Sequence, residues 1–351
     1  MPVIGVDCHK TVHAAVAIDA QGQDLGQWRG PNTVAGWQDL VAWATEHGAD
    51  PVWGIEGSGQ YGRGLAQVVV QTGHAVHEVN PRLTAAMRRS SRARGKSDRL
   101  DARAIARVVQ QDPSLPVVRA EDATAVLAVQ VSARDGLVGE ITALRNRLAQ
   151  HLVQLAPVHD LPWPPLTKRT AVATLVDLRV PDADALMQAH ASQVRLLVAR
   201  ILLAMDQVAA LTAEITRLSA GWTAPLLAIV GVGPLTAGMV AAHLGGKTFA
   251  TDAQLAMYAG VAPLDASSGH QTRHRLNRTG NRHLNAILHR IALTQSRTSP
   301  QATAYLAKKQ AEGKTRTEAF RCLKRFLARA VLTAWNHCPV PSLKEIEAAL
   351  T

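Results

Sequence analysis

Two short apolar segments near the start of this chain each end in a carboxylate, and that pattern limits how the first third of the sequence can fold. The segment VIGVD ends at Asp7, and VWGIE ends at Glu56. Both segments contain β-branched residues, which favour strands, and a strand places its last side chain at the edge of its sheet. We therefore expect an α/β domain in which Asp7 and Glu56 face a functional site at a sheet edge.

A second pair of acids, Asp98 and Asp101, lies in the segment KSDRLDA. The following residues, LDARAIARVV, have helical periodicity, so we expect a helix that begins near Ser97 and presents both carboxylates on one face. Any one of these acids, taken alone, is most often a solvated or salt-bridged surface residue. Four carboxylates that converge need cations, and all-oxygen ligands favour hard ions. The sequence therefore predicts a Mg²⁺ site.

The second pair of acids lies within a basic segment, residues 82–107, that contains no other acid. A second basic segment spans residues 273–329, and the whole chain of 351 residues has a net charge of +11 and a pI near 10.1. Such segments suit a nucleic-acid backbone, while the acids hold ions that act on one phosphate. The predicted contacts to nucleic acid are Arg89, Arg92, Arg94 and Lys96 in the first segment and Arg273, Arg275 and Arg278 in the second.

The cysteines and the apolar segments indicate a cytosolic protein. Cys8, Cys322 and Cys338 form no CxxC pair, so neither a disulfide framework nor a zinc site is expected. The chain opens directly into a predicted strand, without a signal peptide. Residues 224–246 lack Asp, Glu, Lys and Arg and approach the length of a membrane span, but a Gly-Val-Gly-Pro turn interrupts them. No membrane partner is expected.

The order of predicted elements divides the chain into three segments. In residues 1–115, three consecutive strands precede alternating helices and strands, and acids end the first and the fourth strand. This is the order of a ribonuclease H-like fold. Residues 116–220 contain two long helices with apolar residues at heptad-like spacing around a proline-rich break. They predict a coiled-coil hairpin that packs on itself or on another subunit. Residues 221–351 are predicted to form a helical C-terminal domain.

A glycine-containing turn in the C-terminal segment predicts contact with a phosphate. LLAIVGVGPLTAGMVAAHLG contains an apolar helix, the turn and a second helix, as in a helix-hairpin-helix element. Gly231 and Gly233 would let backbone N–H groups approach a phosphate, and a plain corner between two helices is the alternative. It is not a dinucleotide-binding fingerprint, because no strand precedes it and no acid follows at the required distance.

Two adjacent serines provide a second chemical signal. Ser267 and Ser268 precede a glycine and a run of arginine and histidine in DASSGHQTRHRLNRTGNRHLN. A Ser-Ser-Gly turn alone is typical of a loop. Next to so many phosphate-binding side chains, the serine becomes a candidate nucleophile toward a phosphodiester. Residues 279–281 would then begin a helix whose N-terminus favours an anion.

The segments GVDCHK, GIEGSG, KSDRLDA, GVGPLTA, YAGVAPLDASSG and RTGNRHLN resemble, in order and over nearly the whole chain, the DEDD-type insertion-sequence transposases that include the Piv DNA invertases. The resemblance implies a RuvC-like N-terminal domain, a coiled-coil linker and a C-terminal transposase domain. It implies that the four acids are the catalytic and metal-binding tetrad and that Ser268 is the nucleophile. The choice of Ser268 over Ser267 rests only on alignment with the family's Ser-Gly pair, since Ser268 directly precedes the glycine.

The resemblance also implies partners. Members of this family are recombinases guided by a structured noncoding bridge RNA that pairs with donor and target DNA. They assemble as dimers and tetramers, with the RuvC-like domain of one subunit completing the serine domain of another. For this chain it implies a nucleoid-associated transposase that cuts and rejoins DNA through a 5′-phosphoserine intermediate.

Three other functions fit parts of the sequence. A Holliday-junction nuclease would use the same acids with water as the nucleophile. A kinase of the actin and hexokinase type shares the strand order and an early aspartate, but we find neither its second phosphate loop nor its adenosine-binding glycine motif. A catalytically inert nucleic-acid-binding protein would keep the basic segments and tolerate loss of the acids.

Overall fold

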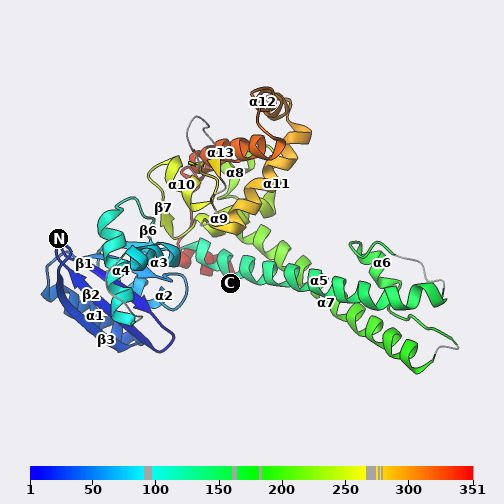
Figure 1. Ribbon diagram of the computed structural model, residues 1–351, viewed down its shortest axis with the longest axis horizontal. Helices are drawn as coiled ribbons and strands as arrows, with labels where there is room; N and C mark the ends of the chain where they lie inside the picture. The colour runs from blue at the N-terminus through cyan, green and yellow to red at the C-terminus, as the bar shows by residue number, and fades with distance from the viewer. Residues whose placement is uncertain are drawn as a thin grey trace. The chain divides into compact units, whose positions relative to one another are not determined.

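The computed structural model groups the chain into two compact units (Figure 1). It describes residues 1–90, 97–159, 164–181, 184–265, 274–275, 277 and 280–350. The first unit combines residues 1–124, 224–232 and 243–351, and the second combines 125–223 and 233–242. The expected boundaries after residues 115 and 220 stay a prediction. Contacts in the folded chain place the N-terminal α/β segment and most of the C-terminal helices in the same unit.

A mixed sheet forms the N-terminal part of the first unit, with the strand order β3-β2-β1-β4-β5-β6-β7. Its first five strands are β1 (Val3–Cys8), β2 (Val12–Ile18), β3 (Asp24–Pro31), β4 (Val52–Glu56) and β5 (Val76–Val79). Strands β1 to β3 form an antiparallel meander, and β4 and β5 continue the sheet parallel to β1. This arrangement is consistent with the predicted ribonuclease H-like domain.

Two short strands extend that sheet with residues from distant parts of the sequence. β6 (Val117–Val118) pairs antiparallel with β5, and β7 (Lys247–Thr248) pairs antiparallel with β6. The Arg119 backbone N–H also donates to the Gly246 carbonyl at 2.8 Å. The C-terminal segment is therefore hydrogen-bonded into the same sheet as the strands that carry the acids.

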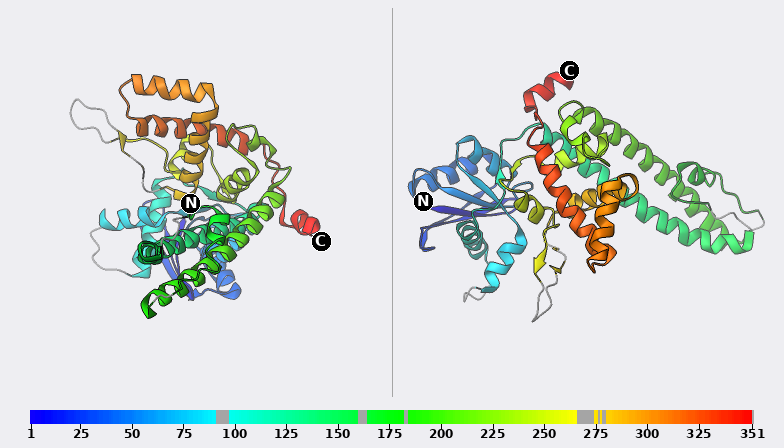
Figure 2. Two further views of the ribbon diagram at one scale, coloured as in Figure 1. Left: turned by 90° about the vertical axis from the view of Figure 1, so that its right-hand side faces the viewer. Right: turned by 90° about the horizontal axis from the view of Figure 1, so that it is seen from above.

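Helices cover both faces of the sheet (Figure 2). Ile4 and Val6 pack with α1 (Val34–Glu46) and α2 (Arg63–Gln71), whereas Val3 packs with α4 (Asp98–Gln111). A further helix, α3 (Pro81–Ser90), contacts α4. Alternate side chains of β1 thus lie in two different cores, as the two-residue period of a strand requires. Burial on both faces explains why VIGV is apolar throughout.

Glycines in the central strands let α4 lie directly on the sheet. A Cβ atom added at Gly5 would be 2.1 Å from the Ala102 carbonyl oxygen and 2.4 Å from the Ala106 backbone nitrogen. At Gly54 it would be 2.5 Å from Cγ2 of Val109. Small residues on both surfaces therefore bring the helix closer than ordinary side chains permit.

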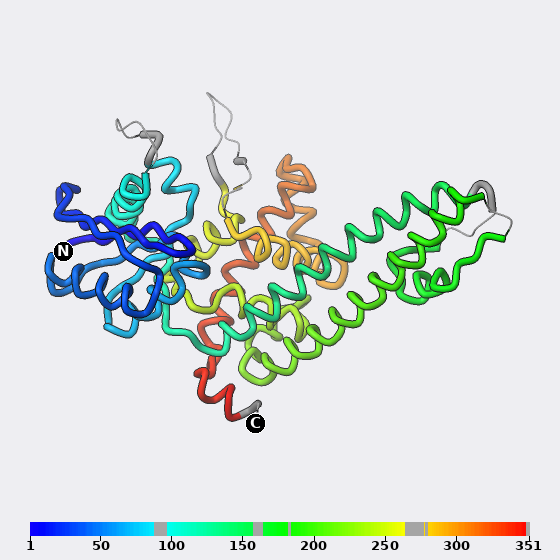
Figure 3. The backbone as a smooth tube through the Cα atoms, turned by 90° about the horizontal axis from the view of Figure 1, so that it is seen from below, coloured from blue at the N-terminus to red at the C-terminus, as the bar shows by residue number. Residues whose placement is uncertain are grey.

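The second unit contains two long helices that run side by side (Figure 3). They are α5 (Ala123–His159) and α7 (Ala185–Ser219), with the short α6 (Arg169–Ala173) between them in sequence. Leu144, Leu148 and Val194 belong to their shared apolar core. By length and composition α7 could also cross a membrane, but its buried apolar residues pack inside this helix pair. The pair has the long helices that the sequence predicts, while the coiled-coil geometry stays a prediction.

The C-terminal residues form mostly helices. Their elements are α8 (Ala224–Leu227), α9 (Pro234–Leu244), α10 (Asp252–Tyr258), β8 (Leu264–Asp265), β9 (His274–Arg275), α11 (Arg282–Thr298), α12 (Pro300–Ala311), α13 (Arg316–Trp335) and α14 (Leu343–Leu350). In the GVGP turn, Gly231 has a φ of +86°, and an added Cβ would lie 3.1 Å from Cβ of Thr294 on α11. At Gly233, an added Cβ would meet no atom within 4 Å. Because α8 has only four residues, the helix-hairpin-helix also stays a prediction.

An alanine at Gly5 is expected to destabilise the first unit by about 1–3 kcal/mol or more, because its Cβ would overlap the backbone of α4. Urea unfolding followed by circular dichroism measures the effect. The matched control is Gly59→Ala, where an added Cβ meets no atom within 4 Å. An unchanged unfolding midpoint for Gly5→Ala would contradict the close packing of α4 on β1.

Candidate metal centre

Two of the predicted acids come from the ends of neighbouring parallel strands. Val6 of β1 lies opposite Ile55 of β4, so Asp7 and Glu56 follow at adjacent positions. Gly5 lies two residues before Asp7 on β1. Gly54 lies two residues before Glu56 on β4, and both glycines face α4. The two-residue period of a strand therefore directs both carboxylates to the α4 side of the sheet.

The other two acids lie in the first turn of α4. Ser97 caps this helix, and its Oγ accepts a hydrogen bond from the Leu100 backbone N–H at 3.3 Å, so the helix begins where the sequence predicts. Asp101 is buried, whereas the side chain of Asp98 is 44% exposed. Acids in the first turn also favour the helix, since its N-terminus carries partial positive charge.

The electrostatics of Asp7 reflect all four acids. Burial raises the pKa of the Asp7 carboxyl above its ordinary value, and the negative charges of Asp101, Glu56 and Asp98 raise this pKa further. Among the neighbours that act on Asp7, only His9 lowers the pKa of its carboxyl. The predicted carboxylates therefore lie close enough to repel one another, which is the environment that a bound cation relieves.

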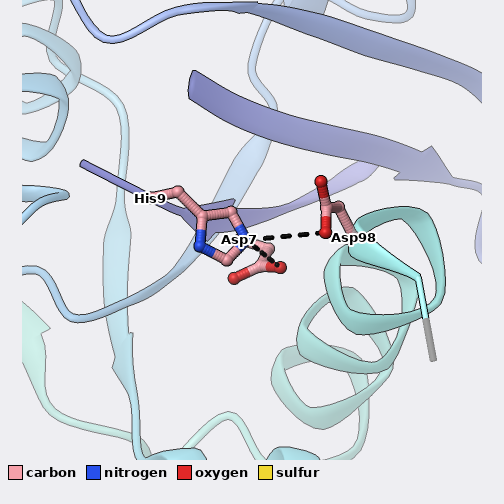
Figure 4. A group of neighbouring side chains, drawn as sticks. All are labelled: Asp7, His9 and Asp98. Atoms are coloured by element: carbon pink, nitrogen blue, oxygen red, sulfur yellow. Dashed lines mark ion pairs between the residues drawn. The ribbon is translucent and has the colours of Figure 1, made fainter. Parts of the chain in front are cut away.

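His9 lies between two of the acids (Figure 4). Its Nε2 atom is 3.2 Å from Oδ2 of Asp7 and 3.6 Å from Oδ1 of Asp98. Arg29 of β3 approaches Asp98 from outside, with Nη2 3.9 Å from Oδ2. The sequence analysis missed His9, although its two-residue spacing from Asp7 was a usable signal for side chains on one face of an extended chain.

These donors fit a hard divalent cation. Asp7, His9 and Asp98 each offer a ligand atom, and these atoms all lie within 4.8 Å of one another. The carboxylate oxygens are the ligands that Mg²⁺ and Mn²⁺ prefer, and their mutual repulsion falls when a cation binds. An imidazole nitrogen at the same place is more typical of Mn²⁺ or Zn²⁺ than of Mg²⁺. Asp7, His9 and Asp98 could thus share an ion, while the metal-binding roles of the four predicted acids stay a prediction.

Several predicted site residues lie outside the described part of the chain. They are Arg92, Arg94, Lys96, Ser267, Ser268, Arg273 and Arg278. Arg89 belongs to α3 and Arg275 to β9, but their side chains are not among those described. The predicted roles of all nine residues therefore stay predictions.

Comparison with known proteins identifies the family. Residues 4–157 match a family model described as a transposase, of the DEDD type found in IS110, and residues 223–307 match the transposase family of IS116, IS110 and IS902. The chain belongs to the IS110 family of DEDD transposases. It is therefore an enzyme that acts on DNA, and the converging acids lie within the part that matches the DEDD model.

Similar proteins come from insertion elements of Streptomyces and Mycobacterium. The chain is 27% identical to the uncharacterized 44.8 kDa protein of IS116 from Streptomyces clavuligerus, over 92% of this chain and 91% of that protein. It is 26% identical to the uncharacterized 42 kDa protein of IS900 from Mycobacterium paratuberculosis, over 92% of both. With the IS110 43.6 kDa protein of Streptomyces coelicolor it shares 36% identity over 34% of this chain and 31% of that protein.

Asp7→Asn is expected to stabilise this transposase when metal is removed with EDTA. The pKa of Asp7 is raised in the folded state. Its ionised form therefore lowers the stability of the fold once the pH rises above the ordinary pKa of aspartate, and this loss disappears on acidification. At pH 7.5 the melting temperature should rise by about 2 °C. The gain should shrink toward about pH 4.

The matched control is Asp39→Asn, which removes the same charge from an exposed position on α1. Mg²⁺ should raise the melting temperature of the wild-type protein and of Asp39→Asn more than that of Asp7→Asn. A lower melting temperature for Asp7→Asn in EDTA would show that the His9 contact outweighs the repulsion.

Proposed function

We propose that this IS110-family transposase is an RNA-guided DNA recombinase that cuts and rejoins DNA through a 5′-phosphoserine intermediate. The observation that supports the proposal is the convergence of Asp7, Glu56, Asp98 and Asp101: burial raises the pKa of the Asp7 carboxyl, and the charges of the other three acids raise it further. Repelling carboxylates beside a half-exposed helix start suit a site that binds cations and a phosphate together.

In this proposal the four acids hold Mg²⁺ ions. The strand ends supply Asp7 and Glu56, and the first turn of α4 supplies Asp98 and Asp101. Bound Mg²⁺ would polarise the scissile phosphate and stabilise the leaving oxygen. His9 touches both Asp7 and Asp98, so it sets the positions of these two carboxylates, and its protonated form offsets part of their charge.

Ser268 is the proposed nucleophile. Its Oγ attacks the phosphorus, the bond from phosphorus to the 3′ oxygen breaks, and the serine proton passes to a base or to water while the 3′ oxygen takes up a proton. Rejoining reverses this exchange, because a 3′ hydroxyl of another strand attacks the phosphoserine and releases the serine hydroxyl. Each step exchanges one phosphoester for another, so no external energy source is required.

The proposed partners follow from the family resemblance and the charge. A structured bridge RNA would pair with donor and target DNA, and the basic segments would hold the backbones without reading their sequence. We propose a dimer or tetramer, formed through the helix pair of the second unit as a coiled coil, and a helix-hairpin-helix contact to phosphate at Gly231 and Gly233. The protein would act in the cytoplasm at the nucleoid.

A RuvC-like nuclease is the second candidate, because its chemistry would require only the four acids, whose convergence the pKa of Asp7 reflects. Such an enzyme would use the same Mg²⁺ site, and water would replace the serine hydroxyl as the nucleophile. The two candidates differ only in what becomes bonded to the 5′ phosphate.

Removal of any one acid should abolish strand cleavage without unfolding the protein. We expect Glu56→Gln and Asp101→Asn each to lower Mg²⁺-dependent cleavage of an element-end DNA by about 100-fold or more. Asp39→Asn on α1 is the charge-matched control. Retention of DNA binding, measured by gel shift in Ca²⁺, separates lost chemistry from lost binding. Cleavage by Glu56→Gln at the wild-type rate would remove Glu56 from the site.

A covalent adduct at Ser268 would distinguish the recombinase from the nuclease. A suicide DNA substrate that releases one strand after cleavage should trap a protein–DNA ester that survives denaturant and maps by mass spectrometry to the peptide around Ser268. Ser268→Ala should lose both adduct and recombination, while Ser267→Ala, the adjacent control, should keep at least part of each. Normal cleavage by Ser268→Ala with free 5′ ends would support the nuclease.

A further inference from the structure

The loop that follows the acid of β4 is tightly folded. Gly57 begins it with a φ of +73°, which favours glycine. The Gly57 carbonyl then accepts hydrogen bonds from the backbone N–H groups of Gln60 at 2.8 Å and Gly62 at 3.1 Å. The Arg63 N–H donates to the Gln60 carbonyl at 3.1 Å as α2 begins. Residues 57–62 thus form a compact turn rather than an extended connection.

This loop packs against both strands that end in acids. A Cβ added at the buried Gly62 would lie 2.7 Å from Cγ2 of Ile55 and 2.9 Å from Sγ of Cys8. Ile55 immediately precedes Glu56 on β4, and Cys8 immediately follows Asp7 on β1. The position of the loop backbone is therefore set by the same strand ends that position the two acids.

The side-chain amide of Asn32 joins the loop to the turn after β1. Its Nδ2 atom donates to the carbonyl oxygens of Lys10 at 3.1 Å, His9 at 3.4 Å and Tyr61 at 3.4 Å. Its Oδ1 atom accepts a hydrogen bond from Nε1 of Trp37 at 2.8 Å, which orients the amide. One side chain thus fixes the backbone of Tyr61 relative to His9, whose ring contacts two of the acids.

On this fixed backbone Tyr61 exposes 52% of its surface. The other two tyrosines have assigned contacts, since the Tyr258 hydroxyl accepts a hydrogen bond from Asn281 and the ring of Tyr305 lies beside Lys309. An aromatic ring with this exposure contributes little to the core. We propose that Tyr61 stacks on an unpaired DNA base next to the phosphate on which the four acids act.

The chemistry of the substrate favours this role. A DNA strand that pairs with a guide RNA must leave its own duplex, and an aromatic side chain that stacks on an unpaired base beside the phosphate stabilises that state. Stacking accepts every base, since each has a π-face, so it suits an enzyme whose sequence choice would be made by a guide. The inference rests on the proposed function, because it takes the four acids as the place where the DNA phosphate binds.

The test uses the full-length protein and short single-stranded DNA that contains one 2-aminopurine, a base whose fluorescence falls on stacking. Ca²⁺ replaces Mg²⁺ so that binding is measured without cleavage. We expect wild-type protein and Tyr61→Phe to quench the probe. Tyr61→Leu keeps an apolar side chain without the ring, and it should lose the quenching and bind about 5- to 150-fold more weakly. The same oligonucleotide made as RNA tests whether the site takes DNA.

Two further variants make the outcome specific. Asn32→Asp keeps the acceptor for Trp37 but removes the amide donor, so it should weaken quenching while Tyr61 is intact. Val34→Ala changes another exposed apolar side chain and should leave quenching unchanged. Wild-type quenching by Tyr61→Leu, or quenching of the RNA probe alone, would overturn the inference. The proposed function is tested separately by Mg²⁺-dependent cleavage in Asp7→Asn: an active Asp7→Asn would refute the acid site, whatever the result at Tyr61.

Discussion

The close contact between α4 and the strand β1 is the constraint on which the candidate site depends. Two of the acids lie on the sheet and two on the helix, so their separation is set by how near the helix axis comes to the strands. Gly5 on the strand faces Ala102 and Ala106 on the helix, with no space for another methyl group. Larger side chains at these positions would move Asp98 and Asp101 away from Asp7 and Glu56 together.

The carboxylate of Asp7 opposes folding. Burial raises the pKa of Asp7, and three neighbouring carboxylates raise it further, so the ionised side chain is less stable here than in water, and His9 offsets only part of that cost. Stability alone would favour a neutral residue at position 7. The structure therefore bears an electrostatic cost at one sheet edge, and a bound divalent cation is the simplest means to recover it.

The sequence predicted the elements with strong local signals. Short apolar runs gave β1 and β4, and Ser97 with the following periodic residues gave the start of α4, because caps and periodicity are properties of neighbouring residues. The site was less predictable where it depends on distant contacts. Asn32 reaches His9, Lys10 and Tyr61 across turns that have no shared pattern, and the two residues of β7 are too few for any strand signal. Gly231 packs closely against α11, and its predicted contact with a phosphate stays a prediction.

The described residues on either side of the serine segment are firmly attached to the first unit. Asn281 donates its backbone N–H to the Tyr258 carbonyl at 2.6 Å. The Gly280 backbone lies against Gly260, and a Cβ added at Gly280 would be 2.2 Å from the Gly260 backbone nitrogen. Lys247 of β7 lies 5.7 Å from the centre of the Tyr258 ring and forms an ion pair of 3.0 Å with Glu78 of β5.

The sheet that carries the acids at its strand ends is therefore also linked, through β7, to the attachment points of the serine segment. If a second subunit completes each site, as the family resemblance implies, these contacts would make residues 258–260 and 280–281 of each subunit move with the sheet that carries its own acids. In such an assembly the DNA phosphate would meet both the acids and the serine only in the complete complex, which would confine strand cleavage to that complex.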